Sequence, residues 1–210
     1  MKISASFLSI QEPFQENIKK LENTTIDFLH LDIMDGKFVE KKTWKKEDLT
    51  FLKDSKKPLD VHLMVEDVFS YIDEFSTFNP EFITVHYEAV EDIYLVVDYI
   101  HSYGIKAGIS IKPDTSLDVL EPFYDLVDLI LIMTVEPGMG GQSFIEDMSL
   151  KVKQLREKKE KSHYRFLISV DGGINDKTKE KVKETDILVV GSFITKNSDY
   201  QKQVNLLKNE

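Results

Sequence analysis

The chain has 210 residues, of which 41% are hydrophobic and 30% are charged, an ordinary balance for one globular domain with a substantial core. Its formal net charge of −10 gives no basic footprint for nucleic acid or an anionic membrane, so an anionic ligand would need a locally positive site such as backbone N–H groups. The absence of cysteine excludes disulfides and thiolate metal sites.

Short apolar runs alternate with amphipathic, charged segments along the whole chain. Eight of the runs read as strands: residues 2–7, 26–32, 58–64, 82–86, 105–111, 127–134, 165–170 and 186–191. Between them, apolar residues recur near helical spacing, as in Phe14–Ile18–Leu21, Val68–Ile72–Phe75, Ile93–Val96–Val97–Ile100 and Leu150–Val152–Leu155. Breakers such as Pro58, Gly104 and Pro113 fall at the joins.

This order of elements predicts an α/β fold in a single domain over residues 1–210. The expected architecture is a closed (β/α)8 barrel with parallel strands. The alternative is a doubly wound open sheet, which usually has fewer strands and places its ligand at one switch point. Polar residues follow strands all along this chain, which favours the closed barrel.

Four segments join an apolar strand to a polar or glycine-rich end. They are HLDIMDG at 30–36, DVHLMV at 60–65, VEPGMGGQSF at 135–144 and VDGGI at 170–174. His30 and Asp32 are two residues apart, which on a strand places both side chains on one face. An imidazole and a carboxylate that point the same way suit a divalent metal. Because a parallel barrel gathers its strand ends at one rim, the four segments predict one site.

These segments, as HLDIMDGKFV, DVHLMV, MTVEPGMGGQSF and VDGGIN in that order, resemble the ribulose-phosphate 3-epimerase family. The resemblance runs from ISASFLS near the start to VVGSFI near the end, and so covers nearly the whole chain. It implies a TIM barrel, in agreement with the alternation of elements. The departures are modest: Ala5 stands where proline is usual, and Glu40–Lys41 stands where Pro–Asn is usual.

The resemblance implies four metal ligands: His30, Asp32, His62 and Asp171. Two imidazoles and two carboxylates suit one divalent ion, and the sequence does not choose among Zn²⁺, Fe²⁺, Mn²⁺ and Co²⁺. A single histidine at a strand end is more often a hydrogen-bonded core residue, so the prediction depends on all four positions. His86 ends the fourth strand and could line the pocket with Glu88. His101 and His163 are expected at the surface.

The chemistry that the resemblance implies suits these side chains. Inverting a hydroxyl-bearing carbon beside a ketone needs removal of its C–H proton and return of a proton to the opposite face, through an enediolate. A divalent ion stabilises the negative charge, and two carboxylates on opposite faces exchange the roles of base and acid. We predict Asp32 and Asp171 as this catalytic pair. Asp35 is the alternative base, but its place before Gly36 favours a turn.

Substrate-binding residues are predicted at further strand ends. Glycines after the seventh and eighth strands let backbone N–H groups approach a phosphate, where TIM barrels frequently bind one. The glycine-rich loop after the sixth strand resembles the family's loop over the substrate, and strand-end methionines would form a collar that excludes water. The full set is Ser6, Met34, His62, Met64, Met133, Gly138, Met139, Gly140, Gly141, Gly172, Gly173, Gly191 and Ser192.

The resemblance therefore predicts a metal-dependent isomerase that interconverts D-ribulose 5-phosphate and D-xylulose 5-phosphate. The nearest alternative is a related ketose-phosphate 3-epimerase, such as one that acts on allulose 6-phosphate. A non-catalytic sugar-phosphate binder is the second alternative. The expected partner is a phosphorylated ketose, without nucleic acid or membrane, and the lack of an apolar leader in the first residues favours the cytoplasm. The pathway and any homo-oligomer stay open.

Overall fold

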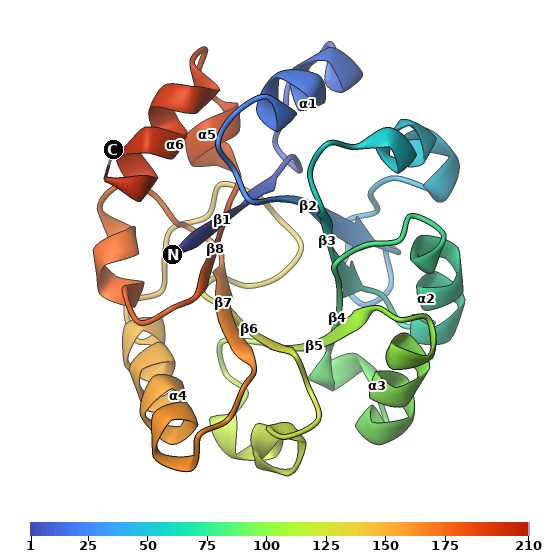
Figure 1. The fold of residues 1–210 in the computed structure, drawn as a ribbon, viewed down its shortest axis with the longest axis vertical. Helices are drawn as coiled ribbons and strands as arrows, with labels where there is room; N and C mark the ends of the chain where they lie inside the picture. Colours follow the sequence, from blue (N-terminus) through green and yellow to red (C-terminus); the bar gives the residue numbers. More distant parts are fainter. Residues whose placement is uncertain (210) are drawn as a thin grey trace.

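Parallel strands form a closed barrel in the computed structural model, which describes residues 1–209 (Figure 1). Each strand pairs with its neighbours in chain order, and β8 closes the ring against β1. The strands are β1 (Lys2–Ser6), β2 (Phe28–Met34), β3 (Leu59–Met64), β4 (Phe82–His86), β5 (Lys106–Ile111), β6 (Leu129–Met133), β7 (Leu167–Asp171) and β8 (Ile187–Val190). The predicted parallel (β/α)8 TIM barrel is confirmed, and the open doubly wound sheet is excluded.

Helices surround the ring of strands (Figure 1). The α-helices are α1 (Phe14–Glu22), α2 (Val68–Ser76), α3 (Ile93–Ser102), α4 (Met148–Ser162), α5 (Ser192–Thr195) and α6 (Tyr200–Lys208). 3₁₀ helices stand in the other connections: η1 (Lys46–Asp54), η2 (Tyr87–Ala89), η3 (Leu117–Phe123) and η4 (Thr178–Val182). No helix within residues 1–209 is long and apolar enough to span a membrane.

The helical face predicted for α4 is partly wrong. Val152 and Leu155 are buried as expected, but Leu150 is 58% exposed and Met148 takes its place in the core. Residues 148, 152 and 155 follow the spacing of four and three that keeps side chains on one helix face, whereas residue 150 lies off that face.

The larger part of the core lies between the strands and the helices. Strand residues such as Leu31 and Val61 are fully buried there and belong to one cluster with helix residues such as Ile72 and Leu155. Because each strand is covered on both faces, its sequence reads as a nearly continuous apolar run. This double burial is the reason that the strands stand out in the sequence.

A smaller apolar cluster fills the inside of the barrel. Its members include the first residues of the four even-numbered strands: Phe28, Phe82, Leu129 and Ile187. Alternate strands thus supply one layer, as is usual in this architecture. This layer closes the amino-terminal end of the barrel, so that a site inside the ring can open only at the carboxyl ends of the strands.

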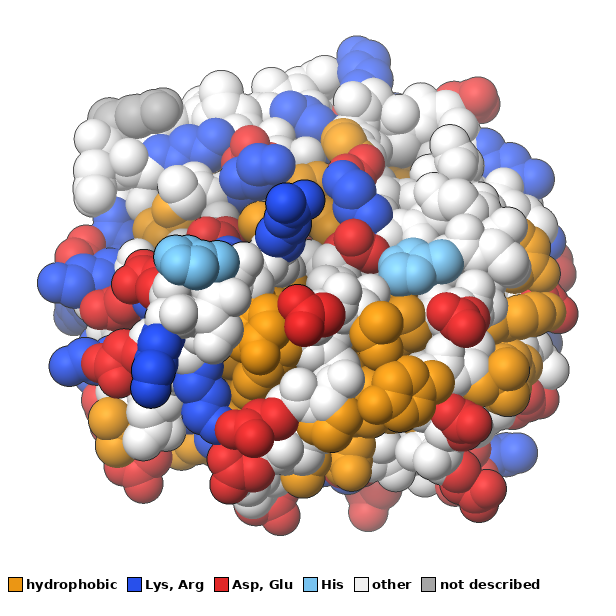
Figure 2. All heavy atoms as spheres, turned by 60° about the horizontal axis from the view of Figure 1, so that its bottom comes forward, with side chains coloured by type: hydrophobic (Ala, Val, Ile, Leu, Met, Phe, Trp, Pro, Cys, Tyr) orange, Lys and Arg blue, Asp and Glu red, His pale blue; other side chains and the backbone are white. Residues whose placement is uncertain are grey.

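The outer surface carries mixed charge. On the face turned forward in Figure 2, basic and acidic side chains are interspersed with hydrophobic ones. His101 pairs on the exterior with Asp128, with 2.8 Å between Nε2 and Oδ2, and its side chain is 39% exposed. His163 ends α4 in the left-handed conformation and is exposed. Both histidines are therefore surface residues, as predicted.

Candidate metal and active site

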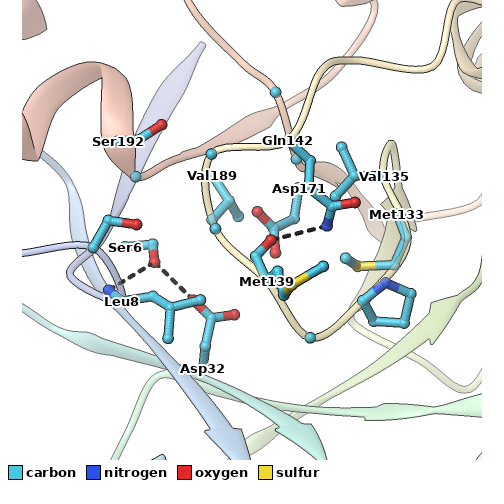
Figure 3. Close-up of a pocket in the computed structure, with 18 of the residues that line it drawn as sticks. Ser6, Leu8, Asp32, Met133, Val135, Met139, Gln142, Asp171, Val189 and Ser192 are labelled. Atoms are coloured by element: carbon cyan, nitrogen blue, oxygen red, sulfur yellow. Dashed lines mark hydrogen bonds between the residues drawn. The ribbon is translucent and has the colours of Figure 1, made fainter. Parts of the chain in front are cut away.

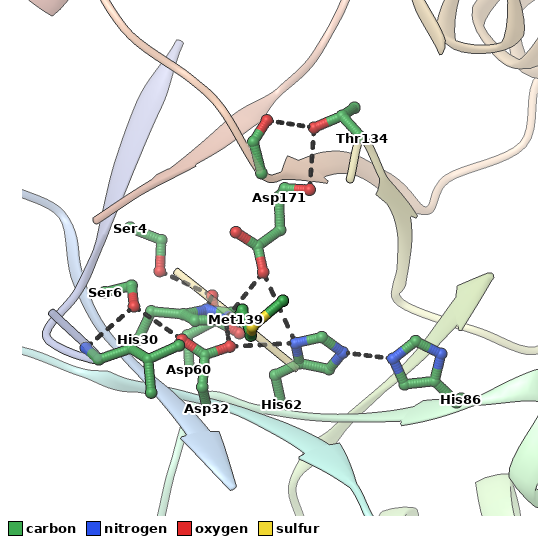
Figure 4. Close-up of polar contacts among 12 residues, drawn as sticks. Ser4, Ser6, His30, Asp32, Asp60, His62, His86, Thr134, Met139 and Asp171 are labelled. Carbon is green, nitrogen blue, oxygen red and sulfur yellow. Dashed lines mark hydrogen bonds and ion pairs between the residues drawn. The ribbon is translucent and has the colours of Figure 1, made fainter. Parts of the chain in front are cut away.

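The four predicted metal ligands lie together at the carboxyl ends of three strands (Figure 4). His30 and Asp32 belong to β2, His62 belongs to β3, and Asp171 ends β7. Asp32 and His62 are direct partners in the β2–β3 register, and the closed ring brings in Asp171. One ligand atom from each residue lies within 4.8 Å of the others. We call these four residues the ligand cluster.

Two histidine nitrogens face the two carboxylates of the ligand cluster. His30 Nε2 lies 3.4 Å from Asp32 Oδ1 and 4.0 Å from Asp171 Oδ2. His62 Nδ1 lies 3.4 Å and 3.8 Å from the same two oxygens. Both nitrogens are buried without a hydrogen-bond partner in residues 1–209. Since buried polar atoms are normally paired, the donor set fits one divalent ion of the kind that takes nitrogen and oxygen ligands.

Polar residues outside the ligand cluster hydrogen-bond to its two β2 members, His30 and Asp32. His30 Nδ1 lies 2.8 Å from Asp60 Oδ2, which also accepts a hydrogen bond from Ser4 Oγ at 2.7 Å. Ser6 Oγ donates to Asp32 Oδ2 at 2.7 Å. Sequence reasoning missed Asp60, although its position two residues before a predicted ligand on the same strand already placed it on the inner face.

The sequence-based position of His86 is wrong in one respect. Its ring does not line the pocket but lies fully buried behind His62, with 2.9 Å between the two Nε2 atoms. On its other side, His86 Nδ1 is 3.2 Å from Glu88 Oε2. In the β3–β4 register His62 is the partner of Thr84, and His86 lies two residues further along β4, from where its ring reaches the Nε2 atom of His62.

The two aspartates of the ligand cluster differ in acidity. Burial raises the pKa of Asp171, and the negative charge of Asp32 raises it further, to about 7. Burial acts in the same direction on Asp32, but the charges and hydrogen bonds of His30 and His62 outweigh it and hold the pKa of Asp32 well below its usual range. Asp32 is thus ionised near neutral pH while Asp171 readily keeps a proton, and metal binding would displace that proton.

A pocket opens above the ligand cluster (Figure 3). Most of the predicted substrate-binding residues line it: Ser6, Met34, Met64, Met133, Gly138, Met139, Gly140, Gly141, Gly172, Gly173, Gly191 and Ser192. His62 lies beneath and is fully buried. Lining residues outside the predicted set are Leu8, Ser9, Val135, Glu136, Pro137, Gln142, Ile174 and Val189.

The glycines of the pocket differ in whether the structure leaves room for a Cβ atom. Gly172 has φ +118°, and a Cβ there would lie 2.3 Å from Val135 Cγ2. Gly173 has φ +66°, and its Cβ would lie 2.4 Å from the Phe144 nitrogen. Both positions therefore require glycine for the fold itself. Gly191 is different, because the nearest atom to its Cβ position is Ser6 Cβ at 3.5 Å.

The loop after β6 reaches over the pocket. Met139 lies between Asp32 and Asp171 in the view of Figure 3 and is 66% exposed. Gln142 Nε2 donates to the Glu136 and Met139 carbonyl oxygens at 2.6 Å and 2.9 Å, which ties the two ends of the loop together. The sequence missed this role of Gln142, although it lies within the GMGGQ segment.

Lys196 is a cationic residue that sequence reasoning missed. Its Nζ is 3.4 Å from the position that a Cβ on Gly141 would take, and Ser192 Oγ is 4.0 Å from the same point. The side chain is exposed and follows α5 directly. An ammonium group therefore stands at the rim of the pocket beside the predicted phosphate residues. Its only signal in the sequence was the position four residues after Ser192.

Asp35 has the turn-forming geometry that the sequence favoured. Its Oδ1 accepts the backbone N–H groups of Lys37 and Phe38 at 2.8 Å and 3.0 Å, and its Oδ2 accepts that of Glu66 at 2.8 Å. Gly36 follows with φ +79°. Both carboxylate oxygens of Asp35 are thus engaged by the backbone, outside the residues that line the pocket.

Comparison with known proteins gives relatives of matching length. Residues 2–195 match the profile of the Ribulose-phosphate 3 epimerase family. The Ribulose-phosphate 3-epimerase of Bacillus subtilis (strain 168) is 36% identical, with 99% of this chain and 98% of the relative covered. That of Methanocaldococcus jannaschii is 37% identical, with 99% and 90% covered.

A solved structure supports the fold alone. The 3-hexulose-6-phosphate synthase of Salmonella typhimurium superposes with a TM-score of 0.69 at 17% identity, and the match covers 100% of this chain and 97% of that one. The family itself is shown by the sequence relatives together with the matching profile. The chain belongs to the ribulose-phosphate 3 epimerase family.

Proposed function

We propose that the protein is a metal-dependent ribulose-5-phosphate 3-epimerase, an isomerase that interconverts D-ribulose 5-phosphate and D-xylulose 5-phosphate, with the whole chain as one catalytic domain. One observation carries the proposal. Two carboxylates and two unpartnered histidine nitrogens meet at the floor of one pocket, in a chain that belongs to this family. A plain sugar-phosphate binder would have no use for such a buried set of donors.

Asp32 and Asp171 are the proposed acid and base. They reach the pocket from β2 and β7, which are three strands apart through β8 and β1. One carboxylate removes the C3 proton and the other returns a proton to the opposite face. The hydroxyl of Ser6 fixes the orientation of Asp32 through its hydrogen bond at 2.7 Å. A bound divalent ion would supply a Lewis acid for the negative charge of the enediolate.

The methionines at the strand ends are proposed to keep water from the reacting carbons. Met34, Met64 and Met133 end β2, β3 and β6, and each is at most 2% exposed while lining the pocket. Met139 adds a fourth thioether from the loop above. An apolar rim of this kind strengthens the electrostatic interactions within it and prevents loss of the intermediate to solvent.

The phosphate is proposed to bind at Gly172, Gly173, Gly191 and Ser192. These residues follow two neighbouring strands, β7 and β8, and all line the pocket. Their backbone N–H groups and the Ser192 hydroxyl suit an anion in a chain of net charge −10. Gly138, Met139, Gly140 and Gly141 would cover the bound sugar phosphate from above.

The test is epimerisation by metal-free and metal-reconstituted protein, with ribulose 5-phosphate and allulose 6-phosphate as substrates in deuterated water. We expect turnover of the pentulose phosphate only with one divalent ion per chain, and entry of deuterium at C3. Full activity of verified metal-free protein would contradict the metal role. Faster turnover of allulose 6-phosphate would favour the related epimerase, and binding without turnover would favour the non-catalytic binder.

A further inference from the structure

A line of three side chains runs outward from the ligand cluster. His62 Nε2 lies 2.9 Å from His86 Nε2, and the two rings meet nearly end to end, with 4.9 Å between their centroids and 27° between their planes. His86 Nδ1 lies 3.2 Å from Glu88 Oε2. Both histidines are fully buried. Figure 4 shows the inner part of this line, from Asp171 and Asp32 through His62 to His86.

Glu88 is held in place at the outer end of the line. Its Oε1 accepts the backbone N–H of Lys112 at 2.8 Å and the hydroxyl of Thr115. Its Oε2 is left for His86. Phe38 packs against the His86 ring, with 4.8 Å between the centroids. The residues that hold Glu88 Oε1, Lys112 and Thr115, therefore lie outside the residues that line the pocket.

The hydrogen-bond chemistry of the line permits one arrangement of protons. A carboxylate only accepts, so the hydrogen of a neutral His86 ring lies on Nδ1 and is donated to Glu88. The Nε2 atom of His86 then carries a lone pair and accepts a hydrogen from His62 Nε2. His62 is left with a bare Nδ1, 3.4 Å from Asp32 Oδ1 and 3.8 Å from Asp171 Oδ2.

We propose that Glu88 and His86 are positioning residues that fix His62 in the tautomer whose Nδ1 binds the metal ion. The inference rests on the metal role of the ligand cluster proposed above. His30 is the other histidine of the ligand cluster. Its Nδ1 contacts the Asp60 carboxylate, and its Nε2 faces the ligand cluster. The two ligand histidines thus present opposite ring nitrogens. A carboxylate sets each one: the buried Asp60 acts directly on His30, and the partly exposed Glu88 acts on His62 through His86.

Glu88→Gln is the decisive variant. The Lys112 N–H can only donate, so it would hold the amide oxygen and turn the amide NH₂ toward His86 Nδ1. The Thr115 hydroxyl would donate to the same oxygen, as it does to Glu88. The amide would then donate, each proton along the line would reverse, and His62 Nδ1 would carry a hydrogen aimed at the ligand cluster. Glu81→Gln is the matched control, because Glu81 precedes β4 and pairs with Lys106 in an exposed ion pair.

Two readouts are measured on the full chain. Histidine ¹⁵N NMR of protein freed of metal by a chelator reports which ring nitrogen of His62 carries the hydrogen. Competition between the protein and a chelator for Zn²⁺ reports metal affinity. In the wild type and Glu81→Gln, we expect the hydrogen on Nε2 and equal affinities. In Glu88→Gln, we expect the hydrogen on Nδ1 and an affinity lower by roughly 10–100-fold, the usual effect of losing an outer partner.

The outcomes separate this inference from the proposed function. An unchanged His62 tautomer in Glu88→Gln would overturn the inference, and so would a reversed tautomer with unchanged affinity. A wild-type chain that binds no Zn²⁺ would instead overturn the metal site itself. His86→Phe is the second variant: it keeps a ring beside His62 but offers no acceptor, so lower Zn²⁺ affinity is expected. Wild-type affinity in His86→Phe would count against the inference.

Discussion

Asp32 and Asp171 share one cavity but have different partners. Asp32 accepts a hydrogen bond from Ser6 and faces both ligand histidines, while Asp171 sits opposite an existing negative charge. Environments that separate the acidity of two carboxylates are a common basis for acid and base roles. The family resemblance predicted the pair, but only the folded chain reveals the difference between its members, because it arises from contacts between β1, β2, β3 and β7.

Asp171→Asn tests the acid/base assignment. The amide keeps the shape of the side chain but neither accepts nor returns a proton, so kcat should fall by roughly 10²-fold or more. Deuterium entry at C3 should fall with it. Metal content must be measured in parallel, since Asp171 also belongs to the ligand cluster. Asp35→Asn is the control, because backbone N–H groups engage both its oxygens. A larger loss of kcat in Asp35→Asn would reverse the assignment.

Gly191→Ala tests the phosphate site without disturbing the fold. Its new methyl group would have 3.5 Å to the nearest atom, Ser6 Cβ, at a residue that lines the pocket where the phosphate is proposed. We expect a higher KM for ribulose 5-phosphate and little change in the unfolding temperature. Gly172→Ala is the contrasting variant: its Cβ would lie 2.3 Å from Val135, so it should lower stability by about 1–3 kcal/mol, as overpacking does. An unchanged KM in Gly191→Ala would show that the phosphate does not bind beside Gly191.

The sequence did not reveal the side chains that contact the metal ligands without lining the pocket. Asp60 and His86 do not line the pocket but contact the ligands His30 and His62. Which inner residues touch the ligand and which support it depends on the stagger of neighbouring strands. That stagger is a property of the closed ring and leaves no trace in the local pattern of either strand.

Strands were easier to predict than the connections between them. All eight predicted strands are present, and each end lies within two residues of the predicted one, because covered strands are apolar on both faces. The connections vary more: η3 is a 3₁₀ helix that contains Pro122, and η1 and η4 are also 3₁₀. Periodicity near 3.6 residues detects α-helices and gives little signal for these short segments.

Asp186 joins three elements of the barrel wall. Just before β8, its carboxylate accepts hydrogen bonds from Arg156 and Lys159 of α4 at 2.8 Å and 3.1 Å, and from the N–H of Ile168 in β7 at 2.8 Å. Burial alone would raise the pKa of Asp186, but these donors outweigh it and lower the pKa below its usual value. Asp186 therefore stabilises the fold in its ionised form.

Asp186→Asn should lower the free energy of unfolding at neutral pH by about 1–3 kcal/mol, the range for hydrogen bonds to charged groups. Because the folded-state pKa is depressed, the unfolded chain takes up the proton first as pH falls. The contribution to stability is therefore complete above the pKa of the unfolded chain, about 4, and is lost as the pH falls from there through the lower pKa of the folded state. Denaturant titrations of both proteins at pH 7 and at acid pH should show the difference shrink on acidification. A constant difference would mean that the charge is not involved.

Closure of the barrel makes the site. β2, β3 and β7 are far apart in the sequence, and only a ring in which β8 meets β1 brings Asp171 to the side chains of β2 and β3. The sequence predicted closure from polar strand ends along the whole chain, and the same reasoning placed the site at the carboxyl rim. It could not predict how the loop after β6 crosses the pocket, because that path depends on close approaches such as that of Gly138 to Val39, where an added Cβ would lie 3.1 Å from Val39 Cβ.

Metal binding should stabilise the whole molecule, because the ligand cluster exists only when the ring is closed. An ion that binds the folded chain at about 100 times its dissociation constant adds about 2.7 kcal/mol, which for a chain of this size raises Tm by roughly 5–10 °C. Differential scanning calorimetry of metal-free and metal-loaded protein measures this rise of Tm. His62→Gln should lose most of it, while the exposed variant Glu81→Gln should keep it. An equal rise of Tm in His62→Gln would show that the stabilising ion binds outside the barrel mouth.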